Sequence, residues 1–209
     1  MQERDFQTAE AQAAVRQAVA DVETLTSAEL VIAVRSSSGR YREADYLCGF
    51  AAALVTLLAL LYLPQIFPLW VFVPNLVVGF VVGSFLGSRS ASLRRLLTPR
   101  AALEESVSRS ARAWFVEGRY SRLPQHNAVL VYVALLERRV QVVADLGVSV
   151  TALEPRWSES CRALDEALHP RPDLRRFVAA LRRLGETLSR EHPRLARDRN
   201  ELPDEVEVR

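Results

Sequence analysis

The most prominent pattern in the chain is a long apolar tract that carries no formal charge. Residues 46–88 contain no Asp, Glu, Lys or Arg, whereas charged residues are dense on both sides of this tract. Helices and strands of a soluble core keep a polar face, so a tract that is apolar all round is typical of membrane segments. A buried helical hairpin is the alternative, but the rest of the chain is too short to surround one.

The apolar tract divides into two predicted spans. The first covers residues 46–63 and the second covers residues 69–87, and Pro64 and Pro68 favour a tight turn between them. At 1.5 Å per residue each helix covers roughly 27–28 Å, close to the ~30 Å of hydrocarbon in a bilayer. We therefore expect a two-helix transmembrane hairpin at residues 46–87, with the lipid bilayer as its partner.

Arginines flank the predicted hairpin and are absent from its connector. Three precede the first span and four follow the second, namely Arg35, Arg40 and Arg42, then Arg89, Arg94, Arg95 and Arg100. The positive-inside rule places both flanks, and hence both termini and the soluble residues, in the cytoplasm. The first residues contain no apolar run, so no cleavable signal peptide is expected. The expected location is the cytoplasmic (inner) membrane, in a multi-pass topology.

Small residues predict how the two spans pack. Glycines recur at every fourth position of the second span, and small residues of the first span fall opposite them when the chain folds back. Small residues allow close helix approach in lipid, and a hydrogen bond between Thr56 and Asn75 could satisfy the amide. Dimerisation is the rival use of the glycine ridge; packing within the hairpin is favoured because the small residues face each other. The expected packing residues are Gly49, Ala53, Thr56, Asn75, Gly79, Gly83 and Gly87.

Outside the tract, apolar residues alternate between helical and strand periods. The predicted order is helix 8–25, strand 29–35, the hairpin, a helix that ends at Gly118, strands 128–135 and 139–145, a helix from 155 and a last helix that follows Asp173. Thr8, Thr98 and Asp173 are the expected N-caps, and Pro99 suits a first helical turn.

This order predicts an α/β fold. A strand, helix and strand favour a parallel pair, and the short turn 136–138 adds an antiparallel strand. We expect a small mixed sheet of about three to four strands with helices on both faces. The soluble domain is then discontinuous, made of residues 1–40 and 98–192, and residues 193–209 form a polar tail.

Several segments resemble the TPM-domain family. TSAEL (Thr26–Leu30) is similar to the family's TSGE segment, ARAWF (Ala111–Phe115) fits its helix motif, and residues 127–148 fit its diagnostic strand hairpin. Trp157 and RNELPDEV (Arg199–Val206) resemble a bacterial subgroup with a membrane insert at this position. Glu29 and Asp145 match the pattern, whereas Ala28, Ala128 and Leu146 depart from it.

The resemblance implies a range of activities. Family members are described as weak acid phosphatases, as calcium-binding domains, and as assembly or accessory factors for membrane complexes. None of these activities transfers to this chain from the motifs alone. Calcium is therefore implied by the resemblance only, and no cofactor is expected from the residues themselves.

The strand ends supply the candidate catalytic residues. Asp145 ends a strand, where α/β sites commonly lie, and His126 and Asn127 begin the neighbouring strand. Glu29 begins the first strand and shares this edge if the two strands run parallel. A phosphatase with Asp145 as nucleophile would need a metal or arginine clamp, for which Arg119 and Arg122 are possible phosphate ligands. The structural alternative is that Asp145 caps the next turn and Glu29 pairs with an arginine.

Other candidate sites are weaker. Asp165 and His169 share a helical face and would supply half a metal site, but the further ligands are missing, so no metal is expected. The paired arginines Arg175-Arg176 and Arg182-Arg183 could contact anionic headgroups or form a solvated face. No nucleic-acid motif accompanies them. The favoured function is a non-catalytic interaction or assembly module at the membrane, with another membrane protein as a candidate partner. The alternative is a membrane-tethered phosphatase centred on Asp145.

Overall fold

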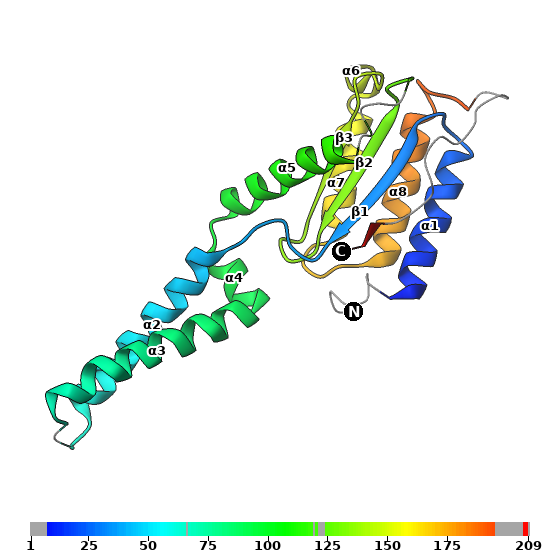
Figure 1. Cartoon of the computed structure of the whole chain (residues 1–209). Helices are drawn as coiled ribbons and strands as arrows, with labels where there is room; N and C mark the ends of the chain where they lie inside the picture. Colours follow the sequence, from blue (N-terminus) through cyan, green and yellow to red (C-terminus); the bar gives the residue numbers. More distant parts are fainter. Residues whose placement is uncertain (1–7, 66, 119, 121–123, 195–206, 209) are drawn as a thin grey trace. The chain divides into compact units, whose positions relative to one another are not determined.

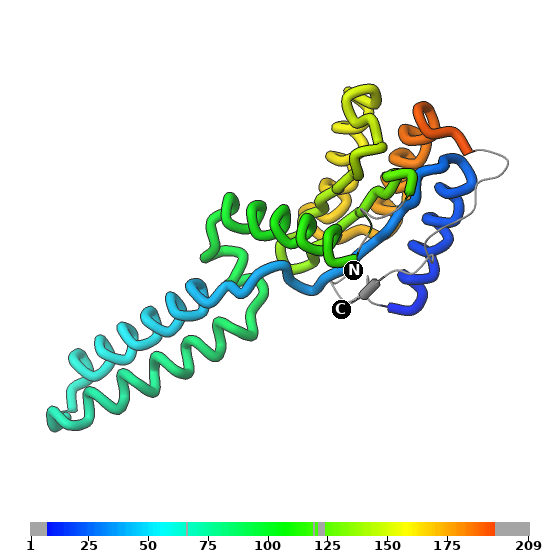
Figure 2. The backbone as a smooth tube through the Cα atoms, turned by 45° about the horizontal axis from the view of Figure 1, so that its top comes forward, coloured from blue at the N-terminus to red at the C-terminus, as the bar shows by residue number. Residues whose placement is uncertain are grey.

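The chain forms two structural units, and it leaves the first unit to build the second before it returns. The computed structural model describes residues 8–65, 67–118, 120, 124–194 and 207–208. One unit contains residues 1–38 and 104–209, and the other contains residues 39–103. Figure 2 traces this path by colour, from the blue segment into the cyan helices and back through the green ones. The second unit is thus an insertion within the sequence of the first.

A mixed sheet lies at the centre of the first unit. Strands β1 (Glu29–Arg35) and β2 (Ala128–Ala134) are parallel, with Glu29 opposite Ala128. Strand β3 (Arg139–Ala144) pairs antiparallel with β2, and the two-residue β4 (Glu207–Val208) pairs parallel with β1, which gives the order β3-β2-β1-β4. Nearly every residue of β1 and β2 is buried, as expected for strands covered on both faces. The predicted small mixed sheet is confirmed.

Helices cover both faces of the sheet (Figure 1). Helices α1 (Ala9–Glu23), α7 (Arg156–Glu166) and α8 (Leu174–Leu188) share a core with one set of alternating strand residues. Helix α5 (Arg100–Glu117) packs on the other set. The short α6 (Val150–Leu153), which precedes α7, had no signal in the apolar pattern. The predicted α/β class with helices on both faces is therefore confirmed.

The helix caps explain where several of these helices begin. Thr8 accepts a hydrogen bond from the Ala11 N–H at 3.2 Å, and Asp173 accepts one from the Arg175 N–H at 3.0 Å, as predicted. Thr98 differs from the prediction because it ends the preceding helix instead of capping α5. The Pro99 carbonyl then accepts the first hydrogen bonds of α5, from Ala102 and Leu103.

The second unit consists of helices α2 (Arg42–Tyr62), α3 (Leu69–Arg89) and α4 (Ala91–Leu97). Helix α2 begins at Arg42 and not at residue 46, so its first turn carries acidic residues. Such residues are favourable near the positive end of the helix dipole. Helix α4 was not predicted; it begins because the Ser90 hydroxyl accepts a hydrogen bond from the Leu93 N–H at 3.3 Å.

Candidate functional site

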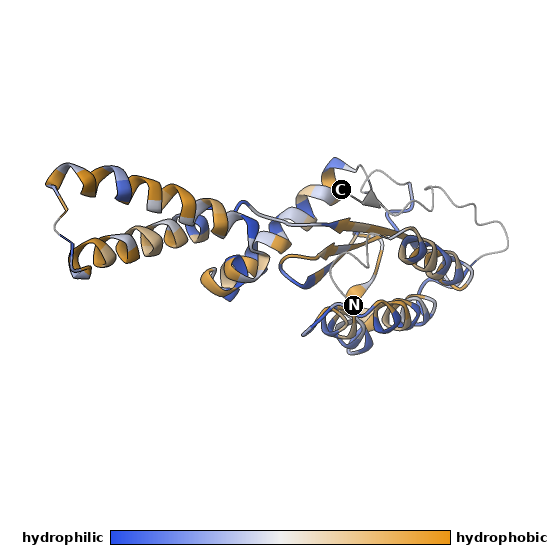
Figure 3. Cartoon of the chain, turned by 90° about the horizontal axis from the view of Figure 1, so that it is seen from below, coloured by the Kyte–Doolittle hydropathy of each residue, from blue (hydrophilic) through white to orange (hydrophobic). Residues whose placement is uncertain are grey.

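Helices α2 and α3 expose apolar side chains over almost their whole length. Each has 21 residues, and their best windows have mean hydropathies of 2.0 and 2.1 with only 11% and 6% of residues buried. Figure 3 shows both helices as largely apolar, whereas polar residues recur along the helices that flank the sheet. By length and composition both are able to cross a membrane. Their low burial distinguishes them from the core helices of a soluble protein.

Glycines form the contact between α2 and α3. A Cβ atom at Gly83 would lie 2.4 Å from the Ala52 Cβ, 2.7 Å from the Cys48 carbonyl oxygen and 3.1 Å from the Gly49 Cα. Gly83 is thus level with Gly49, as predicted. A Cβ at Gly87 would lie 2.7 Å from the Cys48 Cβ. Only glycine allows this backbone approach, which is the usual contact of helices that associate in lipid.

The polar residues of this helix pair are arranged differently from the prediction. The Thr56 hydroxyl donates to the Ala52 carbonyl at 2.9 Å, and the Asn75 amide donates to the Val71 carbonyl at 2.8 Å. The predicted Thr56–Asn75 hydrogen bond is therefore wrong, because each side chain satisfies itself on its own helix. Thr56 instead lies against Gly79, where an added Cβ would be 2.6 Å from the Thr56 hydroxyl.

The register of the contact also differs at one position. Gly79 faces Thr56 and the Ala52 carbonyl, which lies 3.5 Å from the position of an added Cβ. Gly83 likewise faces Ala52. The small residue of α2 in these glycine contacts is thus Ala52, where Ala53 was predicted. A shift of one residue turns a helix by about 100°, so pairing positions by folding the chain back on itself does not determine which side chains face each other.

An ion pair joins α2 to α4 within the same unit. The Arg94 guanidinium donates two hydrogen bonds to the Asp45 carboxylate, at 2.9 and 2.8 Å. The Asp45 side chain is 13% exposed, and the Arg94 side chain is 25% exposed. Hydrogen bonding to this carboxylate raises the pKa of Arg94 above its ordinary value. A bidentate pair of this kind fixes the orientation of both helices.

The predicted catalytic residues lie together at one edge of the sheet. The His126 Nδ1 is 3.2 Å from the Asp145 carboxylate, and the Glu29 N–H donates to the Asn127 carbonyl at 3.1 Å. Because β1 and β2 are parallel and begin level with each other, this is the amino-terminal edge of the parallel pair. The expected proximity of Glu29, His126, Asn127 and Asp145 is confirmed.

The contacts of Asp145 are those of a turn. Its carboxylate accepts from the Leu146 N–H at 2.8 Å, and its carbonyl accepts from the Val148 N–H at 3.1 Å. Gly147 follows in this turn and passes close to the backbone before β2. A Cβ at this position would lie 2.6 Å from the His126 carbonyl oxygen, so a larger residue would not fit. The Asp145 side chain is 5% exposed, which leaves little room for a substrate to reach it. The structure therefore agrees with the alternative that Asp145 caps this turn.

Asn127 has a structural contact at the same edge. Its side-chain amide donates to the Ser27 carbonyl at 2.5 Å and so ties β2 to the segment before β1. Glu29 is buried at the start of β1. The predicted phosphate ligands Arg119 and Arg122 lie outside the described residues, as does the motif at 199–206. Within the part of the chain that the structure describes, no arginine forms an ion pair with Asp145, and no three His, Cys, Asp or Glu side chains group as metal ligands.

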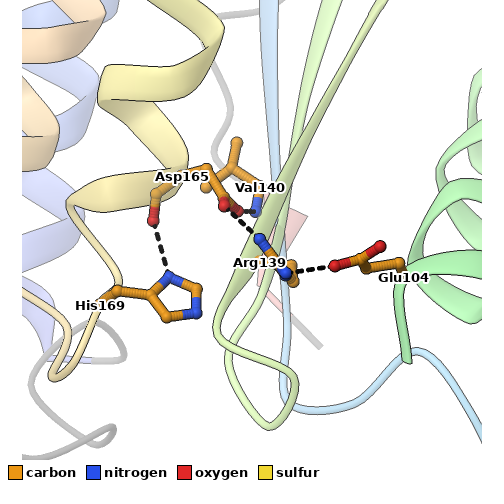
Figure 4. Close-up of polar contacts among 5 residues, drawn as sticks. All are labelled: Glu104, Arg139, Val140, Asp165 and His169. Carbon is orange, nitrogen blue, oxygen red and sulfur yellow. Dashed lines mark hydrogen bonds and ion pairs between the residues drawn. The ribbon is translucent and has the colours of Figure 1, made fainter. Parts of the chain in front are cut away.

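The Asp165 carboxylate and the His169 ring, which the sequence places on one helical face, contact different groups (Figure 4). The Asp165 carboxylate accepts hydrogen bonds from the Arg139 guanidinium at 2.6 Å and from the Val140 N–H at 2.9 Å. The His169 ring lies against the Asp165 carbonyl at 3.1 Å and not against its carboxylate. Arg139 also pairs with Glu104. This network attaches α7 and α5 to the start of β3, so it is a structural feature of the first unit.

The paired arginines of α8 do not act as one basic patch. Arg182 pairs with Asp21 at 2.8 Å, and Arg176 pairs with Asp173 at 3.7 Å. Arg183 lines a cavity of about 230 Å³ between α7 and α8, which Arg156, Arg190, Glu159 and Glu186 also line. The mixed charges of this surface are those of a solvated helix face.

A larger cavity lies at the opposite edge of the sheet, where β1 ends. It has a volume of about 350 Å³ and is lined by residues 35–38, by one face of α5 and by Tyr132 of β2. The α5 face contributes Ser110, Trp114 and Glu117, which recur at helical spacing. This is the carboxyl edge of the parallel pair, the edge at which open α/β sheets bind ligands.

Hydroxyl groups and one arginine dominate this cavity. The Arg35 guanidinium lies over the Trp114 ring, 3.9 Å from its centroid. The Ser38 hydroxyl donates to the Tyr132 hydroxyl at 3.3 Å, and the Ser110 hydroxyl donates to the Ser38 carbonyl at 2.9 Å. Burial raises the pKa of Tyr132 above its ordinary value, so its phenol stays protonated at neutral pH.

Sequence reasoning missed this cavity, although a signal was present. Strand 29–35 ends in an arginine, and three serines follow it directly. Polar residues in the loop after a parallel strand are typical of ligand sites. The residue predicted instead was Asp145, which follows β3. Because β3 runs antiparallel to β2, its end lies beside the amino-terminal ends of β1 and β2, away from this cavity.

Comparisons with known proteins bear on the fold. No family model and no curated protein matches the chain. The chain is similar to the NMR structure of the BA42 protein from the psychrophilic bacterium Bizionia argentinensis, with a TM-score of 0.57 and 16% sequence identity. The similarity covers 96% of this chain and 94% of that one. At this identity it shows a shared fold alone.

Proposed function

We propose that the protein is anchored in a membrane by a transmembrane hairpin, α2–α3, and that its α/β domain is a non-catalytic interaction or assembly module. The observation that carries this proposal is the exposed apolar surface of the two helices. Large side chains such as Trp70, Leu69 and Val73 are 75%, 89% and 68% exposed. Contiguous apolar surface of this extent is not left in water by soluble monomers.

A bilayer accounts for this surface better than a protein core does. Each helix of 21 residues is long enough to span ~30 Å of hydrocarbon, since the rise is 1.5 Å per residue. The glycine contact between the helices supplies the close packing that association in lipid requires. Another membrane protein could cover part of the same surface, in keeping with an assembly role.

The arginines support a cytoplasmic α/β domain. Arg40 and Arg42 lie before the apolar part of α2, and Arg89, Arg94 and Arg95 lie at or beyond the end of α3. The connector 63–68 has no charge. By the positive-inside rule both termini are then cytoplasmic, in the inner membrane of a bacterium.

The TPM-domain resemblance is part of the same proposal. The segments that carry it, residues 26–30, 111–115 and 127–148, contribute to β1, α5 and the β2–β3 hairpin. They are therefore the central elements of the first unit. Assembly or accessory factors for membrane complexes, one of the roles described for that family, suit a domain that is tethered beside a bilayer.

A catalytic role of Asp145 has less support. The carboxylate is occupied by the Leu146 N–H and lies against His126 at the amino-terminal edge of the parallel strands. A phosphatase nucleophile needs a cation that neutralises the incoming phosphate, and the ring of His126 is the basic group that contacts Asp145 among the described residues. An interaction or assembly module needs neither a nucleophile nor a cation at this position.

Site-specific crosslinking tests the proposal. A photo-crosslinking residue is placed at Leu146, which is 93% exposed on the α/β domain, and separately at Val82, which is 50% exposed on α3. The tagged protein is purified in mild detergent, and attached chains are identified by mass spectrometry. If the protein is an interaction module, at least one of the two positions should crosslink to a partner protein in stoichiometric amount. The absence of a crosslinked partner at both positions would contradict this proposal.

The phosphatase alternative has its own control. The purified full chain is incubated with p-nitrophenyl phosphate beside Asp145→Asn, which keeps the size of the side chain. We expect no turnover above background in either protein. If the wild type hydrolyses p-nitrophenyl phosphate and Asp145→Asn does not, the phosphatase alternative is correct and the non-catalytic module is not.

A further inference from the structure

The cavity at the carboxyl edge of β1 and β2 carries a feature that the proposed function does not use. Arg35 is half-buried there, and its contact is the face of the Trp114 ring. No carboxylate pairs with Arg35 among the described residues. A guanidinium has five N–H donors in its plane, and stacking on an aromatic ring leaves these donors available.

The rest of the lining consists mainly of hydroxyl groups. The Trp114 Nε1–H has no hydrogen-bond partner within the described residues, but this atom is fully buried, so the ring contributes its face to Arg35 and not this donor to the cavity. The serine hydroxyls at 36, 37, 38 and 110 surround the same space. The Ser38 and Ser110 hydroxyls already donate to the Tyr132 hydroxyl and to the Ser38 carbonyl, so Arg35, Ser36 and Tyr132 are the lining groups that can meet a ligand.

We infer that this cavity binds a phosphate-type oxyanion, with Arg35 as its charged ligand and the exposed Ser36 hydroxyl as a further donor. Arginine binds phosphate oxygens through two parallel N–H donors, which suits a tetrahedral group. The neutral Tyr132 phenol adds a donor without a competing charge. The volume of about 350 Å³ accommodates a phosphate together with a small polyol.

The negative charges near the cavity leave room for an anion. Glu117 lines the rim, but its position at the end of α5 is exposed, so water screens its charge. The Glu137 carboxylate accepts from the Ser38 N–H at 2.7 Å, which stabilises its charge and directs this oxygen to the Ser38 backbone. Arg35 is left as the charge that an incoming anion meets.

The oxyanion could belong to a free metabolite or to a lipid headgroup. The lipid source rests on the proposed membrane anchor. Six residues lie between Arg35 and the start of α2 at Arg42, and the seven residue steps between these two positions span at most roughly 25 Å when extended. Because this linker to the proposed hairpin is short, a lipid headgroup is tested beside the free phosphates.

Isothermal titration of the full chain in a neutral detergent tests this inference. Inorganic phosphate and glycerol 3-phosphate represent the free source, and short-chain phosphatidic acid represents the lipid source, with short-chain phosphatidylcholine as its matched neutral lipid. Binding of the small phosphates assigns a soluble ligand, and binding of phosphatidic acid alone assigns a headgroup. Binding of none of the phosphates overturns the inference, whether or not the protein proves to be membrane-anchored.

Variants connect the binding to the cavity. Arg35→Gln should weaken phosphate binding about tenfold to hundredfold, since it removes a charge-assisted pair. Arg112→Gln, at an exposed position of the same α5 helix, is the matched control and should leave affinity unchanged. Equal affinity of Arg35→Gln and wild type would overturn the assignment.

Two further variants keep the test independent of folding. Ser36 is exposed, so Ser36→Asp should fold normally and weaken phosphate binding by repulsion. Glu117→Gln removes the rim carboxylate and should tighten binding about twofold to fivefold. A loss of affinity in Glu117→Gln would contradict the proposed charge balance of the cavity.

Discussion

Replacement of Gly83 by leucine is the perturbation that most directly tests the packing of α2 against α3. Gly83 is buried, and an added Cβ would lie 2.4 Å from the Ala52 Cβ and 2.7 Å from the Cys48 carbonyl oxygen. The second contact is with backbone, so no side-chain rotation relieves it. The two helices have to move apart to admit even one methyl group.

The size of the effect follows from this geometry. Overpacking of a close contact typically costs about 1–3 kcal/mol, and leucine adds further atoms beyond the Cβ. For a chain of this size that corresponds to a fall of roughly 2–12 °C in Tm. Val82→Leu is the matched control. Val82 is next to Gly83 in the sequence, but its side chain is 50% exposed, so it has room for a leucine. It should change the Tm of the helix pair by less than about 2 °C.

The two cysteines allow each unit to be followed separately. Cys48 lies against Gly87 in the helix pair, where an added Cβ would be 2.9 Å from its sulfur. Cys161 belongs to α7, and burial raises its pKa to about 12, so it reacts slowly with a maleimide dye until the domain unfolds. Thermal labelling in a Cys161→Ser background reports the helix pair, and labelling in a Cys48→Ser background reports the α/β domain.

Gly83→Leu should lower the labelling temperature of Cys48 and leave that of Cys161 unchanged. An unaltered Cys48 transition would refute the close helix contact. Equal shifts in Gly83→Leu and Val82→Leu would mean that bulk, and not the glycine contact, determines the stability of the helix pair.

Further predictions concern the α/β domain. Asp165→Asn should lower the free energy of unfolding by about 1–2 kcal/mol in urea, because it weakens the hydrogen bonds from Arg139 and the Val140 N–H; an unchanged midpoint would contradict this role. Gly185→Ala should destabilise the domain because its Cβ would lie 2.7 Å from two methyl carbons of the fully buried Val22. The added Val22→Ala should restore part of the loss from Gly185→Ala, and strictly additive losses in the double-mutant cycle would argue against this contact.

The fold was largely predictable because its signals are local. Strand β1 reads as a continuous β-branched run, and the short turn after β2 leaves little choice but an antiparallel hairpin. Caps such as Thr8 and Asp173 have a direct physical signal. Helix α4 was missed because its seven residues contain too little periodicity to separate it from the helix that follows.

The sites were less predictable because they depend on side-chain orientation across elements. The nearness of His126 and Asp145 followed from strand direction, but their exposure and contacts did not. Asn75 was assigned to Thr56 from register alone, whereas a carbonyl on its own helix was a closer acceptor. The cavity at Arg35 could not be predicted without knowing where α5 packs. That helix brings Trp114 to the end of β1, which is remote from it in the sequence.

Alkaline carbonate extraction of membranes from cells that express the full chain tests the proposed anchor most directly. Carbonate releases peripheral proteins and leaves proteins whose helices span the bilayer in the pellet. The exposed apolar surfaces of α2 and α3 predict that the protein stays in the pellet and is released only by detergent. Its appearance in the carbonate supernatant would contradict the membrane anchor and require a soluble partner for the same surface.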